Sequence, residues 1–254
     1  MAELVVYPDA HPEVTSVDGH ASHIDGTEQS TWAELVAGTG NSANSNFDYL
    51  VFFLAYSSAT TNRWRNLGRG ILLFDTSAIP ADAVIISATL SIYGYYKNDD
   101  LSILPDVNVY SSAPASSIHL VIGDYDSLGS TPFCDTPITY DNFKIGDYND
   151  FIFNAAGLAA IVKGGITKLG LRNANYDVAN VAPAWSTSHS AALYAYSADK
   201  GGIYRPKLTI TYALFVCPYC GGPFDTQEEL DTHIASEHPS IPGNKAYALA
   251  REEL

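Results

Sequence analysis

The sequence predicts a mainly β protein in which antiparallel strands pack as a β-sandwich. Turn residues recur about every ten residues and helical periodicity is scarce, a pattern typical of sandwiches. Charged residues make up only 16% of the sequence, which is low for a helical protein. The 17 tyrosines and the single methionine suit sheet surfaces better than helix interiors. A chain of 254 residues has room for one large all-β domain and an appendage.

The clearest strand pattern lies within residues 68–95. Residues 71–74 are all apolar, as expected of a strand that is covered on both sides. Residues 86–93 then alternate strictly, which predicts a strand with one buried and one wet face. The apolar members of this second run are Ile86, Ala88, Leu90 and Ile92. Between the two runs, residues 75–80 contain Asp, Thr, Ser and Pro, which favour a turn over a helix.

Further strands are predicted from apolar or alternating runs at 4–7, 49–56, 106–110, 168–173, 192–196 and 207–212. Residues 32–37 fit either a strand or a single helical turn. Residues 154–163 predict the one convincing helix of this part, because Asn154 can serve as its N-cap and Gly164 can end it.

Two polar segments, 11–26 and 38–46, are interpreted as loops. The first contains His20 and His23, a pair that offers two metal ligands. No third ligand has a matching spacing, so a solvated loop is the favoured interpretation.

Several of these strands carry a family resemblance. The pattern Arg69-x-x-Leu72-x-Phe74-Asp75-x-Ser77-x-Ile79-Pro80 is followed by Ala-Thr-Leu-Ser-Ile-Tyr at 88–93 and by Arg-Pro-Lys-Leu-Thr-Ile-Thr-Tyr at 205–212. Together these segments resemble the disaggregatase-related (DNRLRE-type) jelly-roll domain, in the versions found in bacteriophage structural proteins and related to carbohydrate-binding modules. The resemblance covers roughly residues 1–213 and implies a jelly-roll β-sandwich there. The matched positions are core and turn positions, so no catalytic residue is carried over.

Residues 214–240 are predicted to form a second, smaller domain. Cys217 and Cys220 are followed by His233 and His238 at the spacing of a C2H2 zinc finger. Two thiolates from a hairpin and two imidazoles from one helix face predict a closed tetrahedral Zn²⁺ site with a structural role. The sequence therefore predicts a small C-terminal ββα finger, in which the metal supplies most of the folding energy.

The surroundings of the four ligands fit the same prediction. Phe215, Phe224 and Leu230 provide the small apolar core that a finger needs, and Thr226 and Glu229 predict a capping box at the helix start. Residues 241–254 are expected to be a tail, with a short helix over 245–254 that offers apolar side chains to a partner.

The charge balance argues against nucleic acid and anionic membranes as partners. The formal net charge is −15, and a surface without cations releases no counterions from phosphates. In the finger, the base-reading helix positions hold Thr226, Glu229 and Thr232, none of which matches the common base contacts. Residues 214–244 contain no Lys or Arg. The finger is therefore expected to be a structural or protein-docking module.

Six aspartates fall in the predicted middle loops: Asp124, Asp126, Asp135, Asp141, Asp147 and Asp150. They stand beside Gly, Asn and Ser, where Asp commonly caps turns. Turn capping is the favoured interpretation, with a Ca²⁺ site as the next alternative. Glycosidase chemistry requires two acids at a set distance, and the sequence has no nucleophile elbow, phosphate loop or dinucleotide motif. We therefore expect no enzymatic activity.

The lone cysteine and the aromatic residues are two further candidates for functional groups. The lone Cys134 stands next to an acid, so a buried apolar role is favoured over a reactive thiol. Trp32, Trp64, Trp185 and the tyrosines are candidates for stacking on sugar rings, although ordinary sheet packing is favoured for most of them.

These observations lead to a functional hypothesis. The favoured one is a non-enzymatic virion structural protein of a tailed phage, as a capsid decoration, head-fibre or tail-surface component. Its expected partners are other virion proteins and copies of itself. No secretory signal is visible in the first residues, so synthesis in the host cytoplasm is expected. The alternative is a carbohydrate-binding module of a glycan-recognising or glycan-degrading system.

Overall fold

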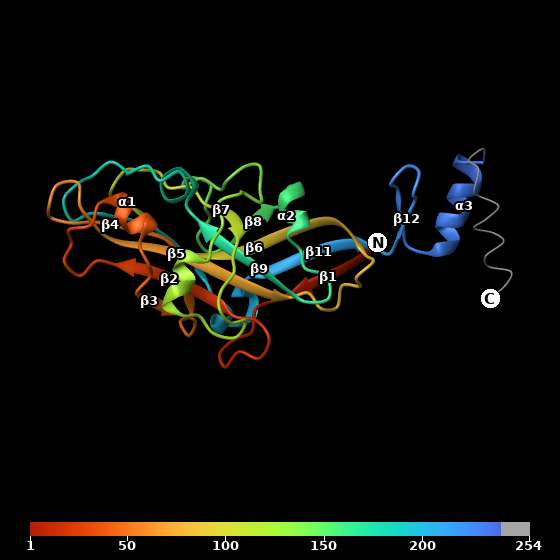
Figure 1. Cartoon of the computed structure of the whole chain (residues 1–254), viewed down its shortest axis with the longest axis horizontal. Coiled ribbons are helices and arrows are strands. Elements are labelled where there is room, and N and C mark those ends of the chain that lie inside the picture. The colour runs from red at the N-terminus through yellow and green to blue at the C-terminus, as the bar shows by residue number, and fades with distance from the viewer. Residues whose placement is uncertain (240–254) are drawn as a thin grey trace.

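The computed structural model describes residues 1–239 and is mainly β, with 38% of residues in strands and 16% in helices. Figure 1 shows an elongated body of strands with the finger projecting beyond one end, next to the N-terminus. The tail predicted at 241–254, with its helix at 245–254, lies outside the described residues. None of the helices within residues 1–239 is long and apolar enough to cross a membrane.

The body contains eleven strands: β1 Ala2–Val6, β2 Asp18–Ile24, β3 Ser42–Asn44, β4 Tyr49–Ser57, β5 Trp64–Asp75, β6 Val84–Asp99, β7 Asn108–Ser111, β8 Tyr148–Ile152, β9 Ile166–Arg172, β10 Ser190–Tyr196 and β11 Lys207–Ala213. Its helices are short: α1 Trp32–Ala37, η1 Ile122–Asp126, α2 Ala155–Ala159, η2 Ala174–Val178, η3 Ala198–Lys200 and η4 Gly202–Tyr204. The finger adds β12 Phe215–Val216, β13 Pro223–Phe224 and α3 Gln227–Glu237.

Two long strands, β5 and β6, organise the body because each changes partners along its length. The first part of β6 pairs with β11 and β8, and its second part pairs with β10. One end of β5 pairs with β4 and the other with β9, while β2 runs along its opposite edge. All these pairings are antiparallel. The strands therefore enclose a single core, as predicted for a β-sandwich.

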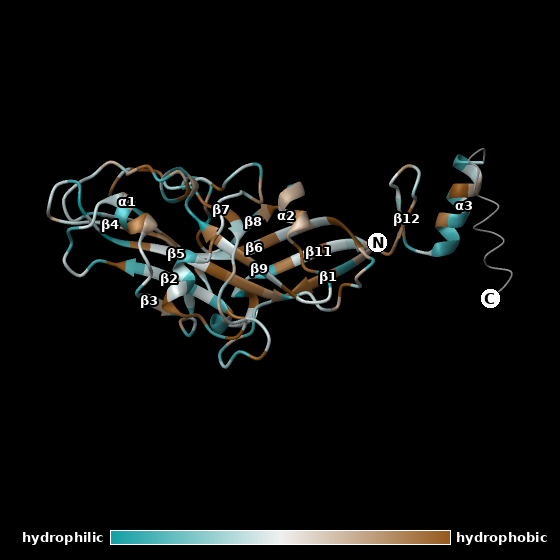
Figure 2. Ribbon diagram, viewed as in Figure 1, coloured by the Kyte–Doolittle hydropathy of each residue, from teal (hydrophilic) through white to brown (hydrophobic). Residues whose placement is uncertain are grey.

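Burial along β5 and β6 follows the sequence pattern. Every residue of β5 from Leu67 to Phe74 is buried, as expected of a strand covered on both sides. On β6, Ala88, Leu90 and Ile92 are buried as predicted, but Ile86 is only half-buried and Ser91, predicted on the wet face, is buried as well. Figure 2 shows apolar residues concentrated along the strands of the body, whereas α3 is mostly hydrophilic.

The prediction of a loop at 11–26 was wrong in its second half. Residues 18–24 form β2, which lies between β5 and β3. His20 and Ser22 are buried there, at 8% and 5% exposure. A strand can lie in apolar surroundings that its neighbours supply, and it then needs no apolar alternation of its own. The polar sequence of β2 therefore resembled that of a loop.

Other boundaries also differ from expectation. The loop predicted at 38–46 contains the three-residue strand β3. Residues 32–37 form a helix, which Thr31 and Glu34 cap reciprocally. The helix predicted at 154–163 begins after its N-cap Asn154 as expected, but it ends at Ala159. The segment beyond it turns because the Thr76 and Thr167 hydroxyls bond its backbone instead.

Candidate metal centre

The finger begins with a short hairpin that carries both cysteines. Phe215 pairs with Phe224 across β12 and β13. Between these strands, the N–H of Cys217 bonds the carbonyl of Gly222, and the carbonyl of Cys217 accepts from Gly221, both at 2.9 Å. Gly221 has φ +74°, a left-handed conformation that glycine adopts without strain. This turn brings Cys220 back toward Cys217.

The helix α3 then positions the histidines. Its N-cap Thr226 accepts the N–H of Glu229 at 3.2 Å, and the Glu229 carboxylate accepts the N–H of Thr226 at 3.1 Å, which is the predicted capping box. His233 lies on α3, but His238 is the residue that caps its C-terminus. The prediction that one helix face presents both imidazoles is therefore corrected: the second imidazole comes from the residue just past the last turn.

The four predicted ligand residues lie together. One ligand atom from each of Cys217, Cys220, His233 and His238 lies within 4.8 Å of those of the other three. The Sγ of Cys220 is 3.2 Å from Nε2 of His233, and the two imidazole rings are 5.1 Å apart. Desolvation works to raise the pKa of Cys217, but N–H groups of Tyr219 and Cys220 and the Cys220 thiol lower it. Such a set of thiols and imidazoles can hold a metal ion.

No family model matches this sequence, and no curated protein matches it either. The functional interpretation therefore depends on the residues and their arrangement.

The predicted apolar core of the finger is small. Leu230 is 7% exposed, and the ring centres of Phe224 and His233 lie 4.7 Å apart.

Beside this contact α3 forms a shallow groove, lined by Phe224, Thr226, Glu228, Glu229, Thr232, His233, Ser236 and Glu237. Its charged residues are all acidic, so the groove does not fit a phosphate backbone.

The six middle-loop aspartates are not brought together as a metal site. Within residues 1–239, only the finger gathers three or more Cys, His, Asp or Glu ligand atoms within 4.8 Å. Asp124 accepts the N–H groups of Ala115 and Val121 at 2.8 and 2.7 Å, and Asp147 accepts the N–H of Tyr148 at 2.7 Å. These two aspartates therefore have the turn-capping role that was favoured for the group.

Cys134 and two of the tryptophans belong to the interior. Cys134 is 3% exposed, and burial raises its thiol pKa to about 12, so it is not a reactive thiol. Trp32 and Trp64 are 2% and 1% exposed and pack edge to face at 5.0 Å. Neither is able to stack on a sugar. Trp185 also packs against the core.

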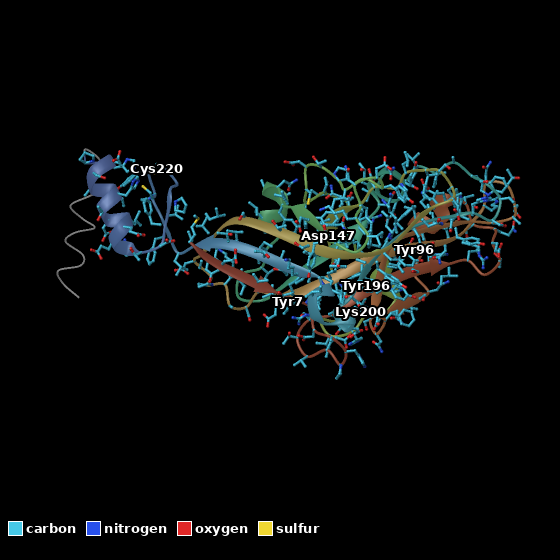
Figure 3. The ribbon with its side chains drawn as sticks, turned by 180° about the vertical axis from the view of Figure 1, so that it is seen from behind. Tyr7, Tyr96, Asp147, Tyr196, Lys200 and Cys220 are labelled. Atoms are coloured by element: carbon cyan, nitrogen blue, oxygen red, sulfur yellow. The ribbon has the colours of Figure 1, made fainter. Side chains whose placement is uncertain are left out.

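A cluster of tyrosines covers part of the sheet surface. We call it the tyrosine face; it consists of Tyr49, Tyr93, Tyr95, Tyr96, Tyr148, Tyr194, Tyr196 and Tyr204. Neighbouring rings lie between 4.8 and 6.1 Å apart. Tyr95 and Tyr96 are the most open, at 41% and 44% exposure. Figure 3 shows this side of the molecule, with Tyr96, Tyr196 and Lys200 labelled.

Two lysines border the tyrosine face. The ammonium of Lys200 lies 5.2 Å from the ring centre of Tyr196, and that of Lys207 lies 4.4 Å from the ring centre of Tyr148. The sequence indicated tyrosines in general as candidates for stacking but did not indicate this cluster. Its signal was the tyrosine pairs at alternate positions, 93 and 95 on β6 and 194 and 196 on β10, which place side chains on one face of a strand.

Proposed function

We propose that this protein is a non-enzymatic structural component of a tailed-phage virion, whose finger binds Zn²⁺ and docks onto another virion protein. The observation that carries the proposal is the finger: a Cys2His2 donor set on a small module with an acidic surface. A module of this kind suits a protein partner better than a nucleic acid.

The donor set favours zinc among the metals. Two thiolates and two imidazoles are the usual ligands of structural Zn²⁺, and a closed set of four leaves no open position for catalysis. Cys217, Cys220, His233 and His238 would hold the ion. The apolar core of the finger is small, so metal binding would supply most of its folding free energy, on the order of 10 kcal/mol or more.

Two observations argue against DNA as the partner of the finger. Residues 214–244 contain no Lys or Arg but contain Asp225, Glu228, Glu229, Asp231 and Glu237. In addition, the side chains of Thr226 and Glu229 form the capping box. They bond backbone N–H groups at the start of α3 and are therefore not available to contact bases. A submicromolar shift of duplex DNA by the zinc-loaded chain at physiological salt would contradict this part of the proposal.

The virion assignment depends on the sequence pattern at 69–80, 88–93 and 205–212, from which we infer a domain like those of phage structural proteins, although no family model matches the chain. The finger projects from one end of the sandwich, so a finger-anchored protein would leave the sandwich directed outward (Figure 1). A capsid decoration, a head fibre or a tail-surface component would use this arrangement. The test is sedimentation of the native source: a virion protein co-sediments with particles at a fixed ratio to a major capsid or tail protein.

The tyrosine face favours a second candidate function, glycan binding by the sandwich. Aromatic rings offer flat apolar surfaces, and the tyrosine hydroxyls can bond sugar hydroxyls. The test is binding of the full chain to a panel of polysaccharides. Saturable binding that is lost in Tyr95→Ala and Tyr96→Ala, but kept in Tyr56→Ala, would support it. Tyr56 is a matched control because its ring contacts Arg65, apart from the tyrosine face.

A further inference from the structure

Positive charge gathers along one border of the tyrosine face. Between Lys200 and Lys207 in the chain stands Arg205, whose guanidinium carbon lies 4.2 Å from the ring centre of Tyr7. The hydroxyl of Tyr148 donates to the backbone carbonyl of Arg205 at 3.1 Å, so Arg205 adjoins the tyrosine face. Figure 3 looks onto this side of the body, with Tyr7 and Lys200 labelled. The whole chain has 13 Lys and Arg against 28 Asp and Glu, so three cations within residues 200–207 form a local exception. We call Lys200, Arg205 and Lys207 the cationic border.

The protein itself does not neutralise most of this charge. Within residues 1–239, no carboxylate forms an ion pair with Arg205 or Lys207, whereas Lys200 pairs with Asp48 at 3.6 Å. The Nε of Arg205 is buried and has no hydrogen-bond partner among the described residues. A buried donor that lacks an acceptor is costly. Arg205 therefore indicates an acceptor that a ligand supplies.

Arg205 lies open to such a ligand because it lines a shallow hollow of about 430 Å³ at the edge of the sheet. Tyr7, Asp9 and Asp75 are among the other lining residues. Both carboxylates accept backbone N–H groups of nearby loop residues, and neither forms an ion pair with Arg205. The guanidinium therefore remains available to a group that enters the hollow.

The two kinds of side chain on this surface select one class of ligand. Tyrosine rings suit the apolar faces of sugar rings, and their hydroxyls suit sugar hydroxyls. A guanidinium forms paired, charge-assisted hydrogen bonds with a carboxylate. The net charge of −15 does not prevent this contact, because salt at about 0.1 M screens exposed charges that are more than about 10 Å away. Sugars that carry carboxylates satisfy both requirements.

A single-stranded nucleic acid fits the same surface less well. It also stacks on aromatic rings, but it requires a positive groove that follows its backbone. Here the cations lie at one border only. Tyr49, Tyr95 and Tyr96, at the other part of the tyrosine face, form no cation–ring contact within the described residues. The distribution of charge thus favours a glycan whose anionic groups lie to one side of its stacked rings.

We propose that the tyrosine face and its cationic border bind an anionic glycan. Its carboxylates contact Arg205 and Lys207, and its sugar rings lie against the tyrosines. This inference rests on the second candidate function, glycan binding by the sandwich, and names the class of glycan.

The experiment uses the full, zinc-loaded chain and three acidic polysaccharides: polygalacturonate, alginate and hyaluronate. Each is compared by calorimetry with its own methyl ester, which keeps the sugar rings but removes the charge. We expect saturable binding of at least one acidic polymer. Esterification should weaken this binding by at least about tenfold, because it removes charge-assisted hydrogen bonds. Raising NaCl from about 50 to about 500 mM should weaken binding of the acid more than binding of the ester.

Two variants locate the carboxylate contacts. Arg205→Gln and Lys207→Gln should each weaken binding of the acid by about fivefold or more and leave binding of the ester unchanged. Such a loss of discrimination would not arise from a structural defect, which would weaken both. The matched control is Arg65→Gln, which should bind like the wild type. Arg65 also lies over a tyrosine, 4.7 Å from the ring centre of Tyr56, but outside the tyrosine face.

Three results would overturn the inference. If acid and ester bind equally well, glycan binding stands but its anionic class is wrong. If none of the six polymers binds, the inference falls together with the second candidate function, while the virion assignment keeps its own test by sedimentation. If a deoxythymidine oligomer binds more tightly than every polysaccharide, the surface belongs to a nucleic acid. Should Arg205→Gln lower the melting temperature, Lys207→Gln decides, because the Lys207 ammonium contacts only a ring among the described residues.

Discussion

Arg69 donates two hydrogen bonds to the carboxylate of Asp177, from Nε to Oδ2 at 2.9 Å and from Nη2 to Oδ1 at 2.6 Å. The two residues are 108 positions apart, and both side chains are almost fully buried. Arg172 binds the same carboxylate in the same two-pronged way, at 2.9 and 2.7 Å. One carboxylate thus joins the central strand β5, the strand β9 and the short helix η2 inside the sandwich.

Replacing Asp177 should therefore be strongly destabilising. Asp177→Asn leaves two buried guanidinium groups without a counter-charge, and such a loss costs about 3–5 kcal/mol of unfolding free energy. Chemical denaturation followed by tryptophan fluorescence measures it. The exposed control Asp147→Asn should change stability by less than about 0.5 kcal/mol. Equal effects of the two substitutions on the unfolding free energy would show that the buried ion pairs of Asp177 stabilise the protein no more than an exposed aspartate does.

The carboxylate of Asp177 should also make the stability of the folded protein depend on pH. Burial works to raise the pKa of Asp177, but hydrogen bonds and charge from Arg172 and Arg69 outweigh it and lower the pKa below 3.8. A carboxyl whose pKa is lower in the folded state stabilises the protein at neutral pH, and this stabilisation is lost as pH falls below the unfolded value. The melting temperature of the wild type should therefore approach that of Asp177→Asn as the pH falls from about 4 toward 2.

Metal removal should affect the finger and leave the sandwich folded. With metal bound, Cys217 and Cys220 should resist iodoacetamide, and after treatment with EDTA both should be alkylated. Cys134 is an internal control that should stay unmodified in both states, because it is buried in the sandwich and its thiol pKa is about 12. Mass spectrometry of peptides reads all three sites at once. Alkylation of Cys134 upon EDTA treatment would show that the two domains unfold together.

The helix cap of the finger should contribute to metal affinity. Thr226→Ala removes the side-chain acceptor for the N–H of Glu229, a loss that costs about 1 kcal/mol. Because the finger folds as it binds metal, the apparent Zn²⁺ affinity should fall by about fivefold. Competition with a chromophoric chelator measures this affinity. Thr232→Ala is the control, since the Thr232 hydroxyl only bonds the carbonyl of Glu228 within the helix.

The sequence predicted the features that local pattern determines. The four finger ligands lie within 22 consecutive residues, 217–238. Their spacing alone predicted correctly that the four side chains lie close together. The alternation along β6 and the apolar run of β5 predicted the burial of both strands. His238 was expected on α3 but lies one residue beyond its end, because the spacing of the ligands does not state where a helix ends.

Features assembled from distant segments were not predictable in this way. The tyrosine face takes its rings from four strands and the short helix η4, so no window of sequence displays it. The hydrogen bond from the Ala198 N–H to Asp18 joins residues near both ends of the sandwich sequence, and the whole of β2, which carries Asp18, was interpreted as a loop. Arg69 was noticed only as part of a family pattern, while its partner Asp177 carried no signal at all.

The most direct test of the central claim compares three forms of the protein in particles from its native source. Wild-type chain and Cys217→Ser chain, with Cys134→Ser as the matched cysteine control, are expressed during particle assembly and separated on a density gradient. We expect wild type and Cys134→Ser to sediment with particles at a fixed ratio to a major structural protein, whereas Cys217→Ser should stay at the top of the gradient with its sandwich folded. If Cys217→Ser sediments with particles like the wild type, the finger is not the docking module. If even the wild type stays at the top, the protein is not a virion component.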